Sequence, residues 1–159
     1  MSGYKLLEQL TAVIIMTMEY PRGLDVLMGK VPPPPAEDIA EMITTCSSSS
    51  DLGVRISGGK FSSEAERILM SEESFTGIID AVGGWEHVNA VIRDWAENYS
   101  TTWNIIVDHV RWVQDSYSRV DQSQLRRIAT KHCTTIETVC RKKREFPKVL
   151  ARAILQTPK

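Results

Sequence analysis

One large residue recurs every seven positions along the third quarter of the chain: Trp85, Ile92, Tyr99, Ile106 and Val113. A seven-residue period keeps side chains on one side of a helix, whereas a strand requires a period of two. We therefore expect one helix, roughly thirty residues long, over 85–117. Its weak point is Ser100-Thr101-Thr102, three poor helix formers that could instead cap a second helix.

A second series of apolar residues lies on the same side of the expected helix: Val88, Trp95, Trp103, Val110 and Tyr117. The two series together form a broad apolar stripe. Such a stripe ordinarily belongs to a core, and it can also form a dimer seam. Thr102 and His109 replace the aliphatic residues that a coiled coil requires, so packing against the N-terminal helices is at least as well supported as a pure two-stranded zipper. We expect a homodimer, with His109 as a polar group in the stripe and no metal site.

Helical patterns also dominate the first half of the chain. A helix is expected over 4–18, ending before Pro21, and its apolar positions cover more than one face. The four prolines of 32–35 predict an extended spacer, and the acidic residues that follow favour a helix start there. A capping box of Ser63 and Glu66 predicts a helix over 64–82, which the glycine pair at 83–84 should interrupt.

Together these patterns predict an all-α fold in which N-terminal helices pack on a long central helix, followed by a C-terminal helix-turn-helix. The expected divisions are an N-terminal helical segment (1–46), a flexible Ser/Gly loop (47–63), a long helical region (64–118) and a basic C-terminal domain (119–159). The three cysteines form no paired motif, which indicates a reducing compartment. With no apolar run long enough to cross a bilayer, we expect a cytoplasmic protein.

The charge of the chain is divided unevenly along its length. Residues 119–159 carry 11 Lys and Arg against 3 Asp and Glu, whereas residues 1–118 carry 8 against 17. The net charge of -1 hides this division. A strongly basic segment beside an acidic one indicates that the basic part has a nucleic-acid or other anionic partner.

The basic segment has the layout of a helix-turn-helix. Asp121 or Ser123 should cap a helix over 124–131, a break follows at 132–134, and Thr135 should cap a second helix over 136–145. Three residues suit the close crossing of two such helices: Ile128, Ala129 and Val139. Cys133 stands in the turn where glycine is most usual, and we expect Cys133 and Cys140 to be small buried side chains. Phe146-Pro147 should end the second helix, and a further helix over 148–156 should complete a small separate core.

The positions of these two helices predict which residues would form a DNA interface. Long basic side chains on the two helices are expected to reach phosphates: Arg126, Arg127, Lys131, Arg141, Lys142, Lys143 and Arg144. Side chains at the start of the second helix are expected to be exposed and to face base edges: Thr135, Ile136, Glu137, Thr138 and Arg141. Six phosphate contacts would make affinity fall with roughly the fifth power of salt concentration.

The residues 125–129 (Leu-Arg-Arg-Ile-Ala), Thr135 and 138–144 (Thr-Val-Cys-Arg-Lys-Lys-Arg) resemble the C-terminal hairpin of phage late transcription regulators of the RinA/ArpU type, which is similar to region four of sigma factors. The resemblance covers about thirty residues specifically and the rest of the chain in layout only. It implies a phage or prophage transcriptional regulator that binds duplex DNA at a promoter and contacts RNA polymerase.

Other functional classes have less support in the sequence. No pair of carboxylates, nucleophile with a base, metal triad or phosphate loop is recognisable, so we expect neither an enzyme nor a cofactor. Two alternatives remain open. One is a small phage adaptor or inhibitor whose acidic part docks on a host protein, and the other is a small DNA-packaging subunit.

Overall fold

The computed structural model describes residues 3–48, 72–116 and 122–158, and in these ranges every regular element is a helix. Eight helices occur there: α1 (Gly3–Glu19), α2 (Gly23–Met28), α3 (Ala36–Ser48), α6 (Glu72–Ala81), α7 (Gly84–Asn98), α8 (Ser100–Ser116), α9 (Gln122–Lys131) and α10 (Ile136–Gln156). The prediction of an all-α fold is confirmed. Residues 49–63 of the expected loop, the Ser63 capping box and residue 121 lie outside the described ranges.

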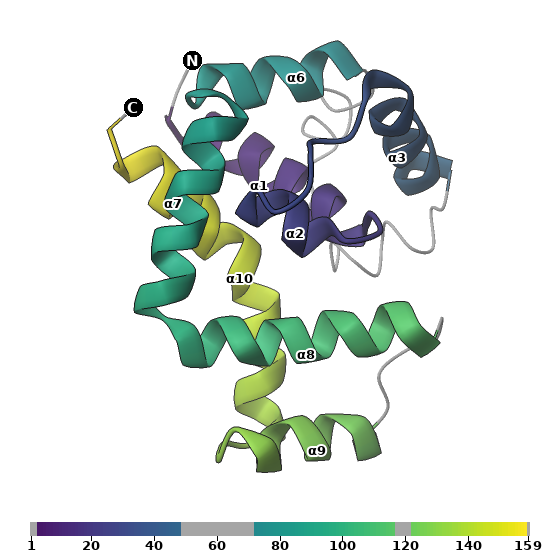
Figure 1. The fold of residues 1–159 in the computed structure, drawn as a ribbon, viewed down its shortest axis with the longest axis vertical. Coiled ribbons are helices and arrows are strands. Elements are labelled where there is room, and N and C mark those ends of the chain that lie inside the picture. The colour runs from purple at the N-terminus through teal and green to yellow at the C-terminus, as the bar shows by residue number, and fades with distance from the viewer. Residues whose placement is uncertain (1–2, 49–71, 117–121, 159) are drawn as a thin grey trace.

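Helix α1 forms the centre of the main core. Its apolar residues are buried nearly all round, because α2, α3, α6 and the second half of α10 pack against different sides of it (Figure 1). Leu10 and Ile14 are fully buried, and the buried Thr17 hydroxyl donates to the Val13 carbonyl at 2.8 Å. The helix ends at Glu19, just before Pro21, as the sequence predicts.

Helix α2 was not expected, since six residues are too few to show a helical period. Its backbone approaches α1 so closely that a Cβ added at Gly23 would lie 1.8 Å from the Thr17 carbonyl oxygen. At its other end, Asn89 of α7 donates from Nδ2 to the carbonyls of Val26 and Leu27, both at 2.8 Å. Asn89 thus adds a second hydrogen bond to the Val26 carbonyl, which also accepts from the Gly29 amide at 3.1 Å, and supplies a donor to the Leu27 carbonyl at the helix end.

The single long helix expected over 85–117 is wrong, because the chain turns a corner at Tyr99 between α7 and α8 (Figure 1). Tyr99 has φ -124° and ψ 48°, outside helical geometry, and its side chain is 57% exposed although it belongs to the seven-residue stripe. The Ser-Thr-Thr run that follows has low helix propensity and starts α8. The break allows α7 to pack on the main core while α8 runs below it.

The break expected at Phe146-Pro147 is also wrong, since α10 continues without interruption to Gln156. Proline removes one helical hydrogen bond and costs about 3 kcal/mol in a helix interior. Here burial offsets that cost: Phe146 packs against the rings of Trp95 and Trp103, with centroids 5.6 and 5.7 Å away. Leu150 and Ile154 join the main core, so the C-terminal residues do not form a separate miniature core.

Candidate nucleic-acid interface

A second, smaller core holds α8, α9 and α10 together below the main body. Its buried residues are Ile105 from α8, Ile128 and Ala129 from α9, and Val139 from α10. The three residues that the sequence singled out for the helix crossing therefore do share one cluster. Ile105 was missed, because the stripe was assigned to the adjacent Ile106. Neighbouring helical residues point about 100° apart, so α8 supplies Ile105 to this cluster and Ile106 to the main core.

The turn between α9 and α10 is fixed by backbone hydrogen bonds. The amide of Thr134 donates to the Ala129 carbonyl at 2.8 Å, and that of Cys133 donates to the Thr130 carbonyl at 3.2 Å. This is a Schellman motif, in which the residue after the helix is left-handed. Cys133 occupies that position with φ 55°, which explains why glycine is usual there. Cys133 and Cys140 are both exposed, so the expectation that they are buried is wrong.

Thr135 caps α10 as predicted: its Oγ1 accepts from the Thr138 amide at 3.1 Å. Its hydroxyl also donates to the Thr138 hydroxyl at 2.9 Å, so these two side chains are engaged with each other. Ile136 is half-buried and packs on the smaller core, so the expectation that it is an exposed base contact is wrong. Glu137 is exposed on the outer side of the helix.

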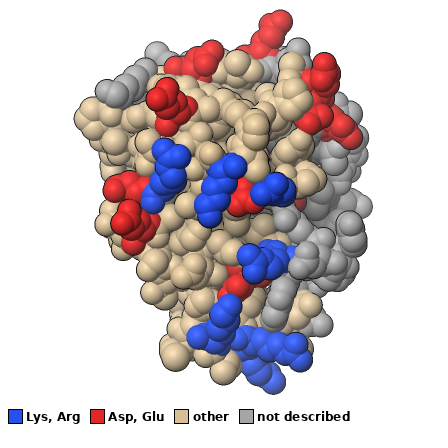
Figure 2. Space-filling view, in the orientation of Figure 1, with Lys and Arg blue, Asp and Glu red and all other residues tan. Residues whose placement is uncertain are grey.

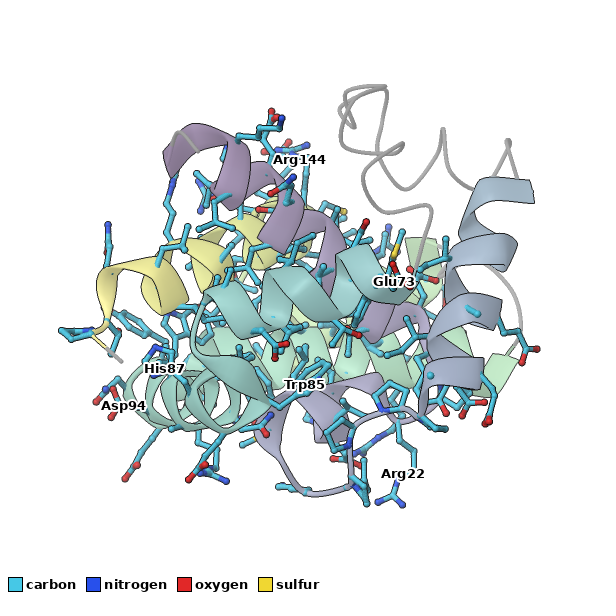
Figure 3. The ribbon with its side chains drawn as sticks, turned by 90° about the horizontal axis from the view of Figure 1, so that it is seen from above. Arg22, Glu73, Trp85, His87, Asp94 and Arg144 are labelled. Carbon is cyan, nitrogen blue, oxygen red and sulfur yellow. The ribbon has the colours of Figure 1, made fainter. Side chains whose placement is uncertain are left out.

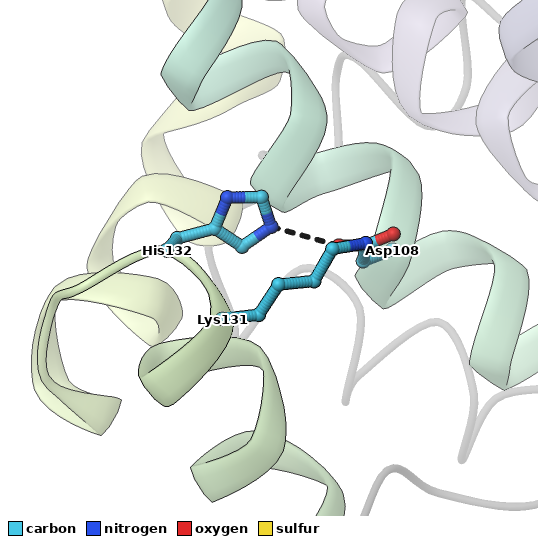
Figure 4. Close-up of polar contacts among 3 residues, drawn as sticks. All are labelled: Asp108, Lys131 and His132. Atoms are coloured by element: carbon cyan, nitrogen blue, oxygen red, sulfur yellow. Dashed lines mark hydrogen bonds and ion pairs between the residues drawn. The ribbon is translucent and has the colours of Figure 1, made fainter.

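A charged contact holds the turn against α8. Asp108 Oδ2 accepts a hydrogen bond from His132 Nε2 at 2.7 Å and pairs with Lys131 Nζ at 3.0 Å (Figure 4). Burial raises the pKa of Asp108, but hydrogen bonds from His132 and Lys131 and their charges outweigh it, so the pKa lies below its usual value. Sequence reasoning missed this contact, because Asp108 and His132 are separated by 24 positions and share no motif.

Helix α9 presents cations on its outer face. Arg126 and Arg127 are exposed, as is Lys131, whose side chain is 66% exposed despite its pairing with Asp108. With Ser123 and Thr130 these residues line a shallow depression. On the face shown in Figure 2, Lys and Arg cluster at the lower end, where α9 lies, and others form a row higher up; most Asp and Glu lie in the upper half.

The four consecutive cations of 141–144 do not share one face, because each helical residue is turned by about 100° from the last. Arg141 and Arg144 are exposed, and Arg144 lies at the outer edge of the molecule in the view from above (Figure 3). Lys142 is half-buried and donates from Nζ to the Thr102 hydroxyl at 2.9 Å. Lys143 is half-buried too and interacts electrostatically with Glu19 and His109.

His109 lies half-buried on α8, and its Nδ1 atom has no hydrogen-bond partner among the described residues. Burial lowers the pKa of His109 to about 4, and the positive charge of Lys143 lowers it in the same direction. Its imidazole is therefore neutral at pH 7. Within the described residues, no group of three metal-ligating side chains occurs.

The described part of the chain is thus an all-α protein that carries a basic helical hairpin fixed to its body by a second core. No known protein family, curated protein or solved structure matches the chain. None of the described helices has the length and apolar character needed to cross a membrane.

Proposed function

We propose that this chain binds duplex DNA through α9 and α10. The observation that carries the proposal is that two helices with a fixed crossing present exposed cations from both partners, Arg126 and Arg127 on α9 and Arg141 and Arg144 on α10. A rigid pair of helices places such groups at constant separations, which favours contacts with the phosphates of a duplex.

In this proposal, the first turns of α10 enter the major groove and α9 crosses the sugar-phosphate backbone. Glu137 is exposed on the outer face of α10 and is the side chain best placed to meet base edges. Thr135 caps the helix, Lys142 donates to the Thr102 hydroxyl of α8, and Lys143 interacts electrostatically with Glu19 of α1. The phosphate contacts then come from Arg126, Arg127, Arg141 and Arg144.

Sequence-specific regulation at a promoter, in a phage or prophage and with RNA polymerase as a partner, is the biological role that such binding would serve. It rests on the resemblance of the hairpin to the phage late regulators. The gathering of acidic side chains at the end away from α9 supports a second candidate, an adaptor whose acidic part docks on a basic host protein (Figure 2).

The exposed and inward-facing cations of one helix provide a matched test. We would measure binding to a labelled random duplex by fluorescence anisotropy, over a series of salt concentrations. The double variant Arg141→Gln/Arg144→Gln should reduce the salt slope, d log K/d log [salt], by about 1.8, since each phosphate contact contributes about 0.9. The control Lys142→Gln/Lys143→Gln removes the same charge from the same turns and should keep the slope.

Three outcomes are decisive. A loss of slope confined to the arginine variant supports the hairpin as the DNA site. An equal loss in both variants indicates a diffuse electrostatic attraction and contradicts the geometry. If the wild type shows no salt-sensitive binding at low ionic strength, DNA binding is excluded and the adaptor becomes the better candidate.

A further inference from the structure

The continuity of α10 through Pro147 places basic residues from both of its halves on one face. Four exposed cations follow each other at intervals of three, four and four residues: Arg141, Arg144, Lys148 and Arg152. At about 100° per residue, all four fall within roughly 80° of the helix circumference. A helix break at Pro147, as the sequence predicts, would separate Lys148 and Arg152 from the hairpin, whereas the continuous α10 joins them to it.

The opposite face of the same segment is anchored in the main core. Phe146, Leu150, Ala151 and Ile154 are buried there, and Pro147 is buried beside them. The backbone that carries Lys148 and Arg152 is therefore held rigidly, and no ordering of the main chain is needed before these side chains meet an anion. Two acidic side chains of α10 are exposed near this row: Glu145 on its flank, and Glu137 one turn before Arg141 on the same face.

We propose that these four residues form a phosphate-binding row and that the DNA interface extends along the whole of α10, to Lys148 and Arg152. At 1.5 Å per residue the row is about 17 Å long, about half of the roughly 34 Å that one turn of B-DNA spans. This inference rests on the proposed function. We take the partner to be a duplex rather than an acidic protein, because the row continues the exposed cations of the hairpin, to which the proposed function assigns phosphate contacts.

The experiment uses the full chain and a random duplex, as above. Lys148→Gln/Arg152→Gln should reduce the salt slope by about 1.8 and weaken binding at 0.1 M salt on the order of 10- to 60-fold. The matched control, Lys30→Gln/Arg93→Gln, removes two exposed cations, one just after α2 and one on α7, far from the row in sequence, and should leave the slope unchanged. All four side chains are exposed, and the hydrogen bond from Arg93 Nη1 to the Met28 carbonyl is long at 3.4 Å, so thermal unfolding should show intact folds.

The outcomes separate the two proposals. A wild type that binds DNA, with an unchanged slope in Lys148→Gln/Arg152→Gln, would overturn the extended row and leave the hairpin proposal standing. A wild type that does not bind DNA would overturn both. If the row variant and its control lose the same amount of salt slope, the four cations act only through the net charge of the protein, and this outcome would also contradict the extended row.

Discussion

Asp108 and His132 are joined by a hydrogen bond of 2.7 Å that fastens the α9–α10 turn to α8, and their side chains are only 16% and 11% exposed. Lys131 extends the contact from the surface. Because removing a partly buried carboxylate would leave two donors without an acceptor, this contact helps to set the angle at which the hairpin leaves the body. Loss of the Asp108–His132 contact should destabilise the hairpin more than the main core.

Replacing Asp108 by Ala should lower the free energy of unfolding by about 1–3 kcal/mol, because His132 is left without its acceptor. Hydrogen exchange should increase mainly in α9 and in the first turns of α10. Asp80→Ala on the exposed face of α6 is the control and should change stability by less than about 0.5 kcal/mol. Unchanged exchange in α9 would show that the contact does not hold the hairpin.

The same contact should weaken in acid. The pKa of Asp108 is lower in the folded state than in the unfolded state, so its contribution to the free energy of unfolding is present above about pH 4, the unfolded value. That contribution is lost as the pH falls through the folded pKa.

His109 should make the protein less stable in mild acid. Its folded pKa is about 4, below the ordinary value of 6.5, so the unfolded state binds more protons between these values. The contribution of His109 to the free energy of unfolding is constant above about pH 6.5. Between about pH 6.5 and pH 4 it falls by at most about 1.4 kcal/mol for each pH unit of acidification. Urea denaturation at pH 7, 6 and 5 measures this change. His109→Gln should remove this part of the slope, and a slope that is identical in the variant would assign it to other groups.

Cys133→Gly should stabilise the protein by about 0.5–1 kcal/mol. A left-handed residue with a side chain carries a steric cost of about 1–2 kcal/mol, which glycine avoids at some expense in the entropy of the unfolded chain. Cys133→Ala keeps the Cβ atom and the left-handed strain, and should change the melting temperature little. Equal effects of the two variants would indicate that the thiol and not the backbone is responsible.

Gly23→Ala should destabilise the fold by about 3 kcal/mol or more, because its Cβ would lie 1.8 Å from the Thr17 carbonyl oxygen and α2 would have to move away from α1. Gly77→Ala provides the opposite case in α6. A Cβ atom there meets nothing within 4 Å, so the variant should gain about 0.5–1 kcal/mol of helix propensity. Differential scanning calorimetry measures both shifts, and a tolerated Gly23→Ala would contradict the close approach of the two helices.

Ile105→Ala tests the smaller core. Loss of its buried side chain should cost about 2–5 kcal/mol, and the effect should be strongest on the docking of α9. Ile14→Ala, at a fully buried position of α1, is the comparison for a similar loss of volume in the main core. Proteolysis that cuts the Ile105→Ala variant no faster than the wild type near α9 would contradict a role in holding the hairpin.

Local patterns were enough to predict much of the described structure. Helical periodicity predicts the all-α fold, the run of prolines predicts where α3 begins, and the Thr135 cap predicts the start of α10. Ile128, Ala129 and Val139 were correctly assigned to the helix crossing. These features depend on residues within a few positions of each other, where the spacing of side chains on a helix and the needs of free backbone amides decide the outcome.

Contacts between distant segments decided the rest. The corner at Tyr99 and the passage of α10 through Pro147 depend on whether burial against α1 and α7 offsets an unfavourable local conformation. The same packing determines which side chains of 141–144 face outwards, since Val139 and Phe146, seven residues apart and both buried, fix the inner side of the helix. Local patterns therefore show that this chain is helical and that residues 122–145 form a basic pair of helices. Arg141 and Arg144 point outwards while Lys142 and Lys143 are half-buried, because the surface on which α10 packs sets the rotation of the helix.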